Sequence, residues 1–262
     1  MWPRVELWLG LVRSLVIYWR PGRQRGLRDF YRPFVGAGDL AFDVGAHLGD
    51  RTQAFRKLGA RVVALEPQPA VRRWLVRLVG RSQDVSVRAE AVGRAVGTAR
   101  LALSRRTPSM SSLAEDWPGS LADRNPAFRG VRWDDSLTVP VTTLDALIEE
   151  YGLPRFCKID VEGYEAEVLA GLSHPIPALS VEFVVGTLEV TEACIQRLDA
   201  LGEYEFNLVE GEKRSFISPR WLASDEMVAW LRGGTMSVSS GDVYARLRPD
   251  TDGGAKDDSS DG

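Results

Sequence analysis

Short apolar runs alternate with segments of helical periodicity along most of this 262-residue chain. Apolar runs bounded by turn residues indicate buried strands, whereas apolar residues three or four positions apart indicate one face of a helix. We expect strands at residues 40–43, 60–65, 85–89, 96–103, 156–160, 177–183, 204–209 and 243–247. We expect helices at residues 2–19, 50–58, 68–79, 142–151, 165–171 and 191–201. Strands that alternate with helices predict an α/β fold built on a doubly wound, mostly parallel sheet.

The N-terminal segment, residues 1–29, is predicted to form an amphipathic helix followed by a basic linker. The apolar residues that share one helical face are Val5, Trp8, Leu9, Val12, Leu15, Val16 and Trp19. Charged residues at Arg4, Glu6 and Arg13 leave the uninterrupted apolar run too short to cross a membrane. The helix would pack on the domain or on a second copy of the chain. Its tryptophans and the arginines that follow also suit contact with a membrane surface.

Composition and charge limit the classes of function. With 44% hydrophobic residues the chain can build a sizeable core, so we expect one domain over residues 30–248 and a disordered acidic tail over residues 249–262. The net charge of -3 gives no electrostatic footprint for nucleic acid. Cys157 and Cys194 lie far apart in apolar contexts, which indicates buried free thiols in a reducing compartment. We therefore expect a cytoplasmic protein, with peripheral attachment to a membrane as the alternative that the N-terminal helix leaves open.

A candidate ligand site follows the first predicted strand. That strand ends at Asp43, and the chain then turns through Gly45 and Gly49 into a helix. In an open α/β sheet the ligand lies outside the carboxyl ends of the strands, where glycines let it approach the backbone. The second predicted strand ends at Glu66, where an acid about 20 residues after the first loop accepts hydrogen bonds from ribose hydroxyls. The two acids therefore predict a nucleoside site, although each could instead cap the turn that follows it.

The residues around Gly45 favour one nucleoside cofactor over another. A dinucleotide site would carry the series G-x-G-x-x-G, but His47 stands at the second glycine position and Asp50 at the third. Asp50 also puts negative charge where a diphosphate would lie. S-adenosylmethionine fits better, because its cationic ammonium and sulfonium groups would be attracted by Asp43. We assign cofactor contacts to Asp43, Gly45, His47, Gly49, Glu66, Glu90 and Ala91, the last two lying at the level of an adenine after the third strand.

A second informative stretch is the predicted strand 156–160, which ends at Asp160 and is followed by Glu162. Acids at a strand end face the crevice of the sheet, so we assign Asp160 and Glu162 a catalytic role toward an acceptor. The alternative is an ion pair of these acids with Lys158 or with a surface arginine. A further alternative is a Mg²⁺ ion bridging Asp160, Glu162 and Glu182, because clustered oxygen ligands suit this ion. We assign no metal ligand, and the two histidines lack the spacing of a zinc site.

Residues 104–136 lose periodicity and contain several prolines. A long irregular segment inside a compact domain is usually a lid or a binding loop. We expect this segment to form part of the acceptor pocket, with a disordered insertion as the alternative.

Taken together, these segments resemble the FkbM family of S-adenosylmethionine-dependent methyltransferases. The matching pieces are residues 42–50, 65–67, 141–145, 158–165 and 168–171, and their order and spacing cover about residues 30–185. The resemblance implies a seven-stranded sheet of the class I methyltransferase, Rossmann-like type. It also implies transfer of a methyl group from S-adenosylmethionine, in many relatives to an oxygen of a sugar or secondary metabolite. His47 departs from the family, where relatives often carry asparagine.

The expected function is therefore O-methylation of a hydroxyl on a sugar, a glycan or a secondary metabolite. The partner would be a small-molecule or glycan acceptor and not a nucleic acid. Two alternatives belong to other classes. An NAD-dependent oxidoreductase is disfavoured by the broken glycine series, and a catalytically silent module would use the same fold only to hold a partner.

Overall fold

The computed structural model describes residues 2–80, 82–104, 106–107, 109–114, 131–233 and 239–249. The strands are β1 (Leu40–Val44), β2 (Arg61–Leu65), β3 (Val85–Arg88), β4 (Ala91–Val92), β5 (Gly97–Leu103), β6 (Asp135–Thr142), β7 (Phe156–Ile159), β8 (Ala178–Val184), β9 (Tyr204–Glu210) and β10 (Ser240–Leu247). The helices are α1 (Trp2–Tyr18), α2 (Arg23–Tyr31), α3 (Asp50–Lys57), α4 (Pro69–Val79), α6 (Leu144–Tyr151), α7 (Glu165–Ala170), α8 (Leu188–Leu201) and α9 (Ser224–Arg232).

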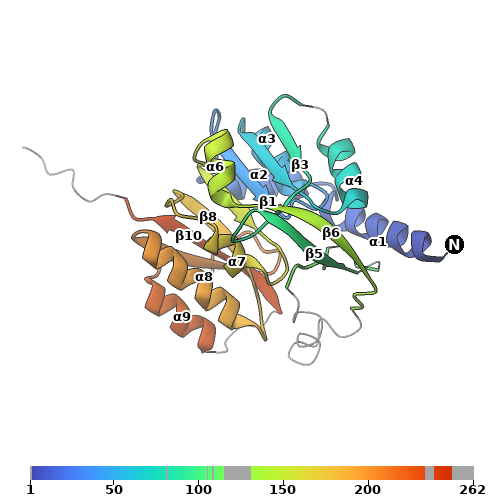
Figure 1. Ribbon diagram of the computed structural model, residues 1–262. Helices are drawn as coiled ribbons and strands as arrows, with labels where there is room; N and C mark the ends of the chain where they lie inside the picture. Colours follow the sequence, from blue (N-terminus) through green and yellow to red (C-terminus); the bar gives the residue numbers. More distant parts are fainter. Residues whose placement is uncertain are drawn as a thin grey trace, which may run out of the picture.

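Within the described residues the strands form a seven-stranded sheet and a smaller three-stranded sheet (Figure 1). The order in the larger sheet is β3-β2-β1-β7-β8-β10-β9, and in the smaller sheet it is β4-β6-β5. In the larger sheet β3, β2, β1, β7 and β8 run parallel, whereas β10 is antiparallel to β8 and β9. The order reverses between β1 and β7, and this switch point is where an open α/β sheet binds its ligands.

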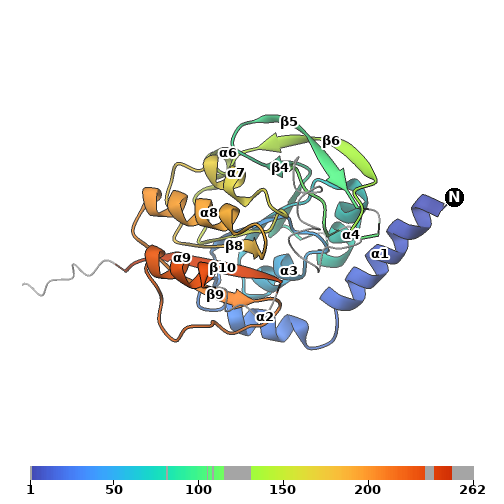
Figure 2. The same cartoon turned by 90° about the horizontal axis from the view of Figure 1, so that it is seen from below.

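Helices cover both faces of the larger sheet (Figure 2). Successive side chains of a strand point to opposite faces. Ala41 of β1 accordingly belongs to a buried cluster with Tyr31 of α2 and Phe55 of α3. Its neighbour Phe42 belongs to a second cluster with Leu147 of α6 and with residues of α7, α8 and α9. The prediction of a doubly wound, mostly parallel sheet is therefore confirmed.

The N-terminal segment differs from its prediction in two ways. The expected linker contains the helix α2, whose Leu27 and Tyr31 are buried against the larger sheet. The helix α1 is present, but Leu11 packs on α4 while Trp8 and Leu9 of the expected apolar face are exposed. Apolar side chains surround α1, so their spacing did not identify the buried face. No helix within the described residues is long and apolar enough to cross a membrane.

Like α2, the strand β6 and the helix α9 lie where the sequence predicted no element. β6 passes through Pro140, a residue that usually argues against a strand. The third strand also ends earlier than expected, because Ala91 begins β4 of the smaller sheet and Glu90 lies between the two sheets. Residues 115–130 of the predicted acceptor segment and residues 250–262 of the predicted tail lie outside the described residues.

Gly45 lets the loop after β1 approach the loop after β7. Its φ angle is 80°, in the left-handed region that side chains with a Cβ rarely adopt. A Cβ atom at this position would lie 1.8 Å from the carbonyl oxygen of Asp160. The two strand ends at the switch point can therefore meet only because this residue has no side chain.

We predict that Gly45→Ala lowers the free energy of unfolding by at least ~2 kcal/mol, from the positive φ angle and the overlap with Asp160 together. Urea denaturation followed by circular dichroism measures this change. The matched control is Gly97→Ala in β5, where a Cβ would meet nothing within 4 Å. Equal stability of the Gly45→Ala variant and the wild type would refute the argument.

Candidate active site

A cavity of about 320 Å³ opens at the carboxyl ends of β1, β2 and β7. Eight of the nine residues that the sequence assigned to the site line this cavity: Asp43, Gly45, His47, Glu66, Glu90, Ala91, Asp160 and Glu162. The ninth, Gly49, is buried against α4, where a Cβ would lie 2.3 Å from Leu75 and 2.7 Å from Val79. Gly49 therefore packs against α4 and is not among the lining residues, and its assignment as a cofactor contact stays a prediction.

The carboxylate of Glu66 is held by backbone N–H groups from the loops after β1 and β2. Its Oε1 accepts a hydrogen bond from the backbone N–H of Gln68 at 2.8 Å, and its Oε2 accepts one from that of His47 at 3.1 Å. Burial raises the pKa of Glu66 to about 7, although these hydrogen bonds act in the opposite direction. Each carboxylate oxygen keeps one further lone pair for a ligand in the cavity.

Asp43 is buried at the end of β1. Its Oδ2 accepts a hydrogen bond from the hydroxyl of Thr52 in α3 at 2.5 Å. Burial raises the pKa of Asp43, while the nearby ammonium of Lys158 acts to lower it. The acid therefore ties β1 to α3 as well as facing the cavity.

Asp160 forms an ion pair with Lys158, in which Nζ and Oδ2 lie 2.5 Å apart. Burial acts to raise the pKa of Asp160, but the charge and hydrogen bond of Lys158 outweigh it and hold that pKa below its usual range. This is the ion pair that the sequence left open as an alternative to a catalytic role. Because Asp160 also lines the cavity, the pair keeps an ionised carboxylate at the site.

Glu162 lies in a strained turn directly after Asp160. Its φ angle is 55°, which is uncommon for a residue other than glycine. The turn is held by Glu165, whose Oε1 accepts hydrogen bonds from the backbone N–H groups of Val161 and Gly163 at 3.0 and 3.3 Å. The hydroxyl of Ser112 also donates to the carbonyl oxygen of Glu162 at 2.6 Å. These contacts hold the backbone of the turn that carries Glu162.

Part of the irregular segment also reaches the cavity. Ser109, Met110, Ser111 and Leu113 line it, on the side where Ser112 contacts Glu162. These positions agree with a role in the acceptor pocket, which stays a prediction.

The N-terminal segment supplies residues that the sequence did not assign to the site. Tyr18 lines the cavity, and its ring lies 5.5 Å from that of His47 in an edge-to-face arrangement. Arg23 of α2 is buried, and its Nε lies 2.7 Å from Oδ2 of Asp50. Nη2 of Arg23 also lies 2.8 Å from Oε2 of Glu212, which follows β9 and lines the cavity. A domain boundary at residue 30 thus does not separate the N-terminal segment from the site.

The cavity is lined by many more acidic side chains than basic ones. Among its described lining residues are nine acidic side chains and two basic ones. The acids are Asp43, Asp50, Glu66, Glu90, Asp160, Glu162, Glu182, Glu212 and Asp242, and the bases are Arg51 and Lys158. Glu90 is paired with Arg88 at 2.6 Å, and Arg51 contacts Asp50 and Glu212. Such a cavity attracts cationic ligands.

Comparison with known proteins identifies the family. A family model described as the methyltransferase FkbM domain matches residues 43–234. The hexuronic acid methyltransferase AglP of Haloferax volcanii is 30% identical over 179 residues, which cover 66% of this chain and 67% of that protein. The chain therefore belongs to the FkbM methyltransferase family, as its motifs implied. It is a methyltransferase, its cofactor is S-adenosylmethionine, and its sheet is of the class I, Rossmann-like type.

Similarity to solved structures is more distant. The precorrin-6y C5,15-methyltransferase of Geobacter metallireducens has a TM-score of 0.43 and 12% identity, with 86% of this chain and 88% of that chain covered. An rRNA methylase of Streptococcus thermophilus has a TM-score of 0.41 and 10% identity, with 84% of this chain and 94% of that chain covered.

The buried carboxyl of Glu165 predicts a pH dependence of stability. Burial raises the pKa of Glu165 from 4.5 to about 7, so the folded state binds more protons than the unfolded chain between these values. The free energy of unfolding should therefore fall as the pH rises from about 4.5 to about 7. Glu165→Gln keeps an oxygen for both backbone N–H groups but cannot ionise. We expect this variant to exceed the wild type by ~1–3 kcal/mol at pH 8 and to match it near pH 4.5.

Urea denaturation at the two pH values measures the difference. Glu167→Gln, on the same helical turn but nearer the surface, controls for the loss of one negative charge. A Glu165→Gln variant that is no more stable than the wild type at pH 8 would contradict the prediction.

Proposed function

We propose that this protein transfers a methyl group from S-adenosylmethionine to a hydroxyl of a sugar, a glycan or a secondary metabolite. The observation that carries the proposal is that Glu66, on one side, and Asp160 and Glu162, on the other, open onto the same cavity. The name of the relative AglP, a hexuronic acid methyltransferase, supports a sugar as the acceptor.

The residues of the cavity fit this cofactor. Glu66 would accept hydrogen bonds from the ribose hydroxyls with the lone pairs that the backbone leaves open. Asp43 would attract the ammonium and sulfonium groups, and Glu90 and Ala91 would lie beside the adenine. The excess of acidic side chains suits a ligand that brings positive charge of its own. The unpartnered Nε2 of His47, which has no hydrogen-bond partner among the described residues, is available to the same ligand.

The acids after β7 would act on the acceptor. When bound, S-adenosylmethionine supplies a methyl group on a sulfonium, which is a good leaving group. Alignment of the acceptor is then a large part of catalysis. Asp160, kept ionised by Lys158, would accept a hydrogen bond from the acceptor hydroxyl, and Asp160 or Glu162 would take its proton as the new bond forms.

Two alternative functions were an NAD-dependent oxidoreductase and a catalytically silent module. Membership of a methyltransferase family gives no support to an NAD-dependent oxidoreductase. A catalytically silent module would bind the cofactor but transfer no methyl group to any acceptor.

Contact of α1 with a membrane or with a second chain stays a prediction, which rests on the exposed side chains of Trp8, Leu9 and Val16. A cytoplasmic location also stays a prediction.

We predict that S-adenosylmethionine and its demethylated product bind to the purified protein and that NAD does not. Glu66→Ala removes the acceptor of the ribose hydrogen bonds and should weaken cofactor binding by ~1.5–3 kcal/mol. Isothermal titration calorimetry measures both. Glu149→Ala, on the exposed side of α6, controls for the loss of one carboxylate. Unchanged affinity in a folded Glu66→Ala variant would rule out the ribose assignment.

We predict that Asp160→Asn and Glu162→Gln keep their affinity for S-adenosylmethionine but lower turnover, by ~10²–10⁴-fold if the residue takes the proton. Turnover is measured with labelled cofactor on the acceptor that a screen of sugars, uronic acids and glycans identifies. If both variants turn over at the wild-type rate, the acids are structural and catalysis rests on alignment or on another base. If no acceptor is methylated while the cofactor binds, the silent module is the better description.

A further inference from the structure

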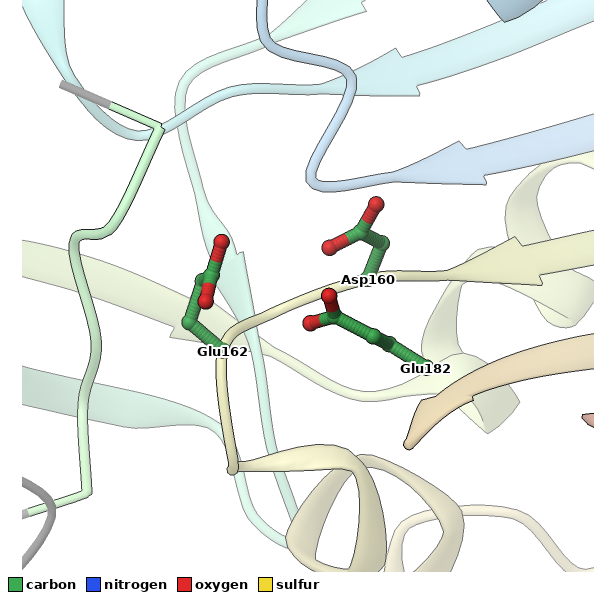
Figure 3. A group of neighbouring side chains, drawn as sticks. All are labelled: Asp160, Glu162 and Glu182. Atoms are coloured by element: carbon green, nitrogen blue, oxygen red, sulfur yellow. The ribbon is translucent and has the colours of Figure 1, made fainter. Parts of the chain in front are cut away.

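Three carboxylates that line the cavity lie close together (Figure 3). Asp160 and Glu162 come from the loop after β7, and Glu182 comes from the adjacent parallel strand β8. Figure 3 shows the three side chains turned toward a common space. One carboxylate oxygen of each lies within 4.8 Å of one oxygen of each of the other two.

Two of these carboxylates lack the partners that a buried acid needs. Glu162 is only 9% exposed, and its Oε2 has no hydrogen-bond partner among the described residues. Oε2 of Glu182, a partly buried residue, also has no hydrogen-bond partner among the described residues. Buried polar atoms are normally satisfied, and an exception in a cavity indicates a ligand, an ion or water. The unpartnered oxygens therefore point to a ligand in the common space.

Positive charge at the cluster is insufficient for three ionised carboxylates. The ammonium of Lys158 is paired with Asp160. The other basic side chain among the described lining residues of the cavity, Arg51, contacts Asp50 and Glu212. A cation in the common space would supply the missing charge.

Glu162 reaches the cluster from a strained backbone conformation. Its left-handed φ angle is maintained by the hydrogen bonds of Glu165 to the flanking N–H groups and by Ser112 on its carbonyl oxygen. A residue with an exposed, solvated carboxylate would gain nothing from this conformation. The strain is explained if the carboxylate is needed at that point.

The spacing of the oxygens fits a hard divalent cation. Two oxygens bound to one Ca²⁺ ion lie at most about 4.8 Å apart, and two bound to one Mg²⁺ ion at most about 4.2 Å, when they are opposite each other. Three ligands cannot all be opposite one another, so small side-chain rotations would have to draw the three oxygens, which now lie within 4.8 Å of one another, closer together around one ion. Three carboxylate ligands would leave other positions of the ion open for water or for hydroxyl groups.

We propose that Asp160, Glu162 and Glu182 bind a divalent cation, whose open positions hold the hydroxyl groups of the acceptor. The binding of the cation stands on the geometry of the cluster, whereas its role toward the acceptor rests on the proposed function. A hydroxyl whose oxygen is bound to such an ion is fixed in position and loses its proton more readily. Glu182 then becomes part of the site beside Asp160 and Glu162.

The test is a titration of the full-length protein with Mn²⁺ alone, followed by electron paramagnetic resonance, in which bound Mn²⁺ loses the sharp signal of the free ion. We expect one Mn²⁺ per chain and its displacement by excess Mg²⁺ or Ca²⁺. Glu182→Gln and Glu162→Gln should each weaken Mn²⁺ binding by at least about tenfold. Circular dichroism establishes that each variant is folded.

Asp242→Asn is the matched control. Asp242 lines the same cavity on β10 and is the register partner of Glu182, but it is not a member of the cluster. We expect its loss to change Mn²⁺ affinity by less than about threefold. If the wild type binds no Mn²⁺, or if Asp242→Asn weakens binding as much as Glu182→Gln does, the proposal is overturned.

A second measurement separates this proposal from the proposed function. Methyl transfer to the acceptor is assayed with and without added Mg²⁺ after treatment with a chelator. Transfer to a hydroxyl that persists without any divalent ion, in a protein that binds no Mn²⁺, overturns the cation site and leaves O-methylation standing. Specific Mn²⁺ binding in a protein that methylates no hydroxyl supports the site and overturns the function.

Discussion

The buried ammonium of Lys158 is the charge on which the site depends. It lies in the middle of the larger sheet with only 2% of the residue exposed, in direct contact with Asp160. Burial alone would lower the pKa of Lys158, but the carboxylates of Asp160 and Asp242 raise it and keep the group charged. A buried charge is tolerated only when it is paired. Lys158 therefore allows acids from β7 and β10 to gather at the switch point, while compensating only part of their charge.

Conformational strain is concentrated at the same place. Among the described residues, the ones other than glycine with a positive φ angle are His47 and Glu162, and both line the cavity. His47 is held through its N–H group by Glu66, and Glu162 is held in its turn by Glu165. Strained residues persist where the surrounding structure fixes them, which is common at functional sites. The two loops that carry them meet at Gly45, where the missing side chain allows the contact.

Distant parts of the chain complete the cavity wall. Arg23 of α2, Asp50 of α3 and Glu212 after β9 form one network of ion pairs. Arg51 joins Asp50 to Glu212 in the same network. Arg23 is buried, so its charge is tolerated only because these carboxylates compensate it. The N-terminal helices are therefore part of the structure around the cavity and not an appendage to the domain.

The sequence by itself determined the central strands and most of their terminal acids. β1, β2 and β7 are buried on both faces, so each reads as an apolar run, and Asp43, Glu66 and Asp160 mark where each run ends. Only the tertiary structure decided the buried face of α1, the strand through Pro140, the packing role of Gly49 and the ion pairs of Arg23. The physical reason is that local periodicity records burial along one element. Contacts between residues far apart in the chain, such as that of Arg23 with Glu212, depend on which elements lie side by side.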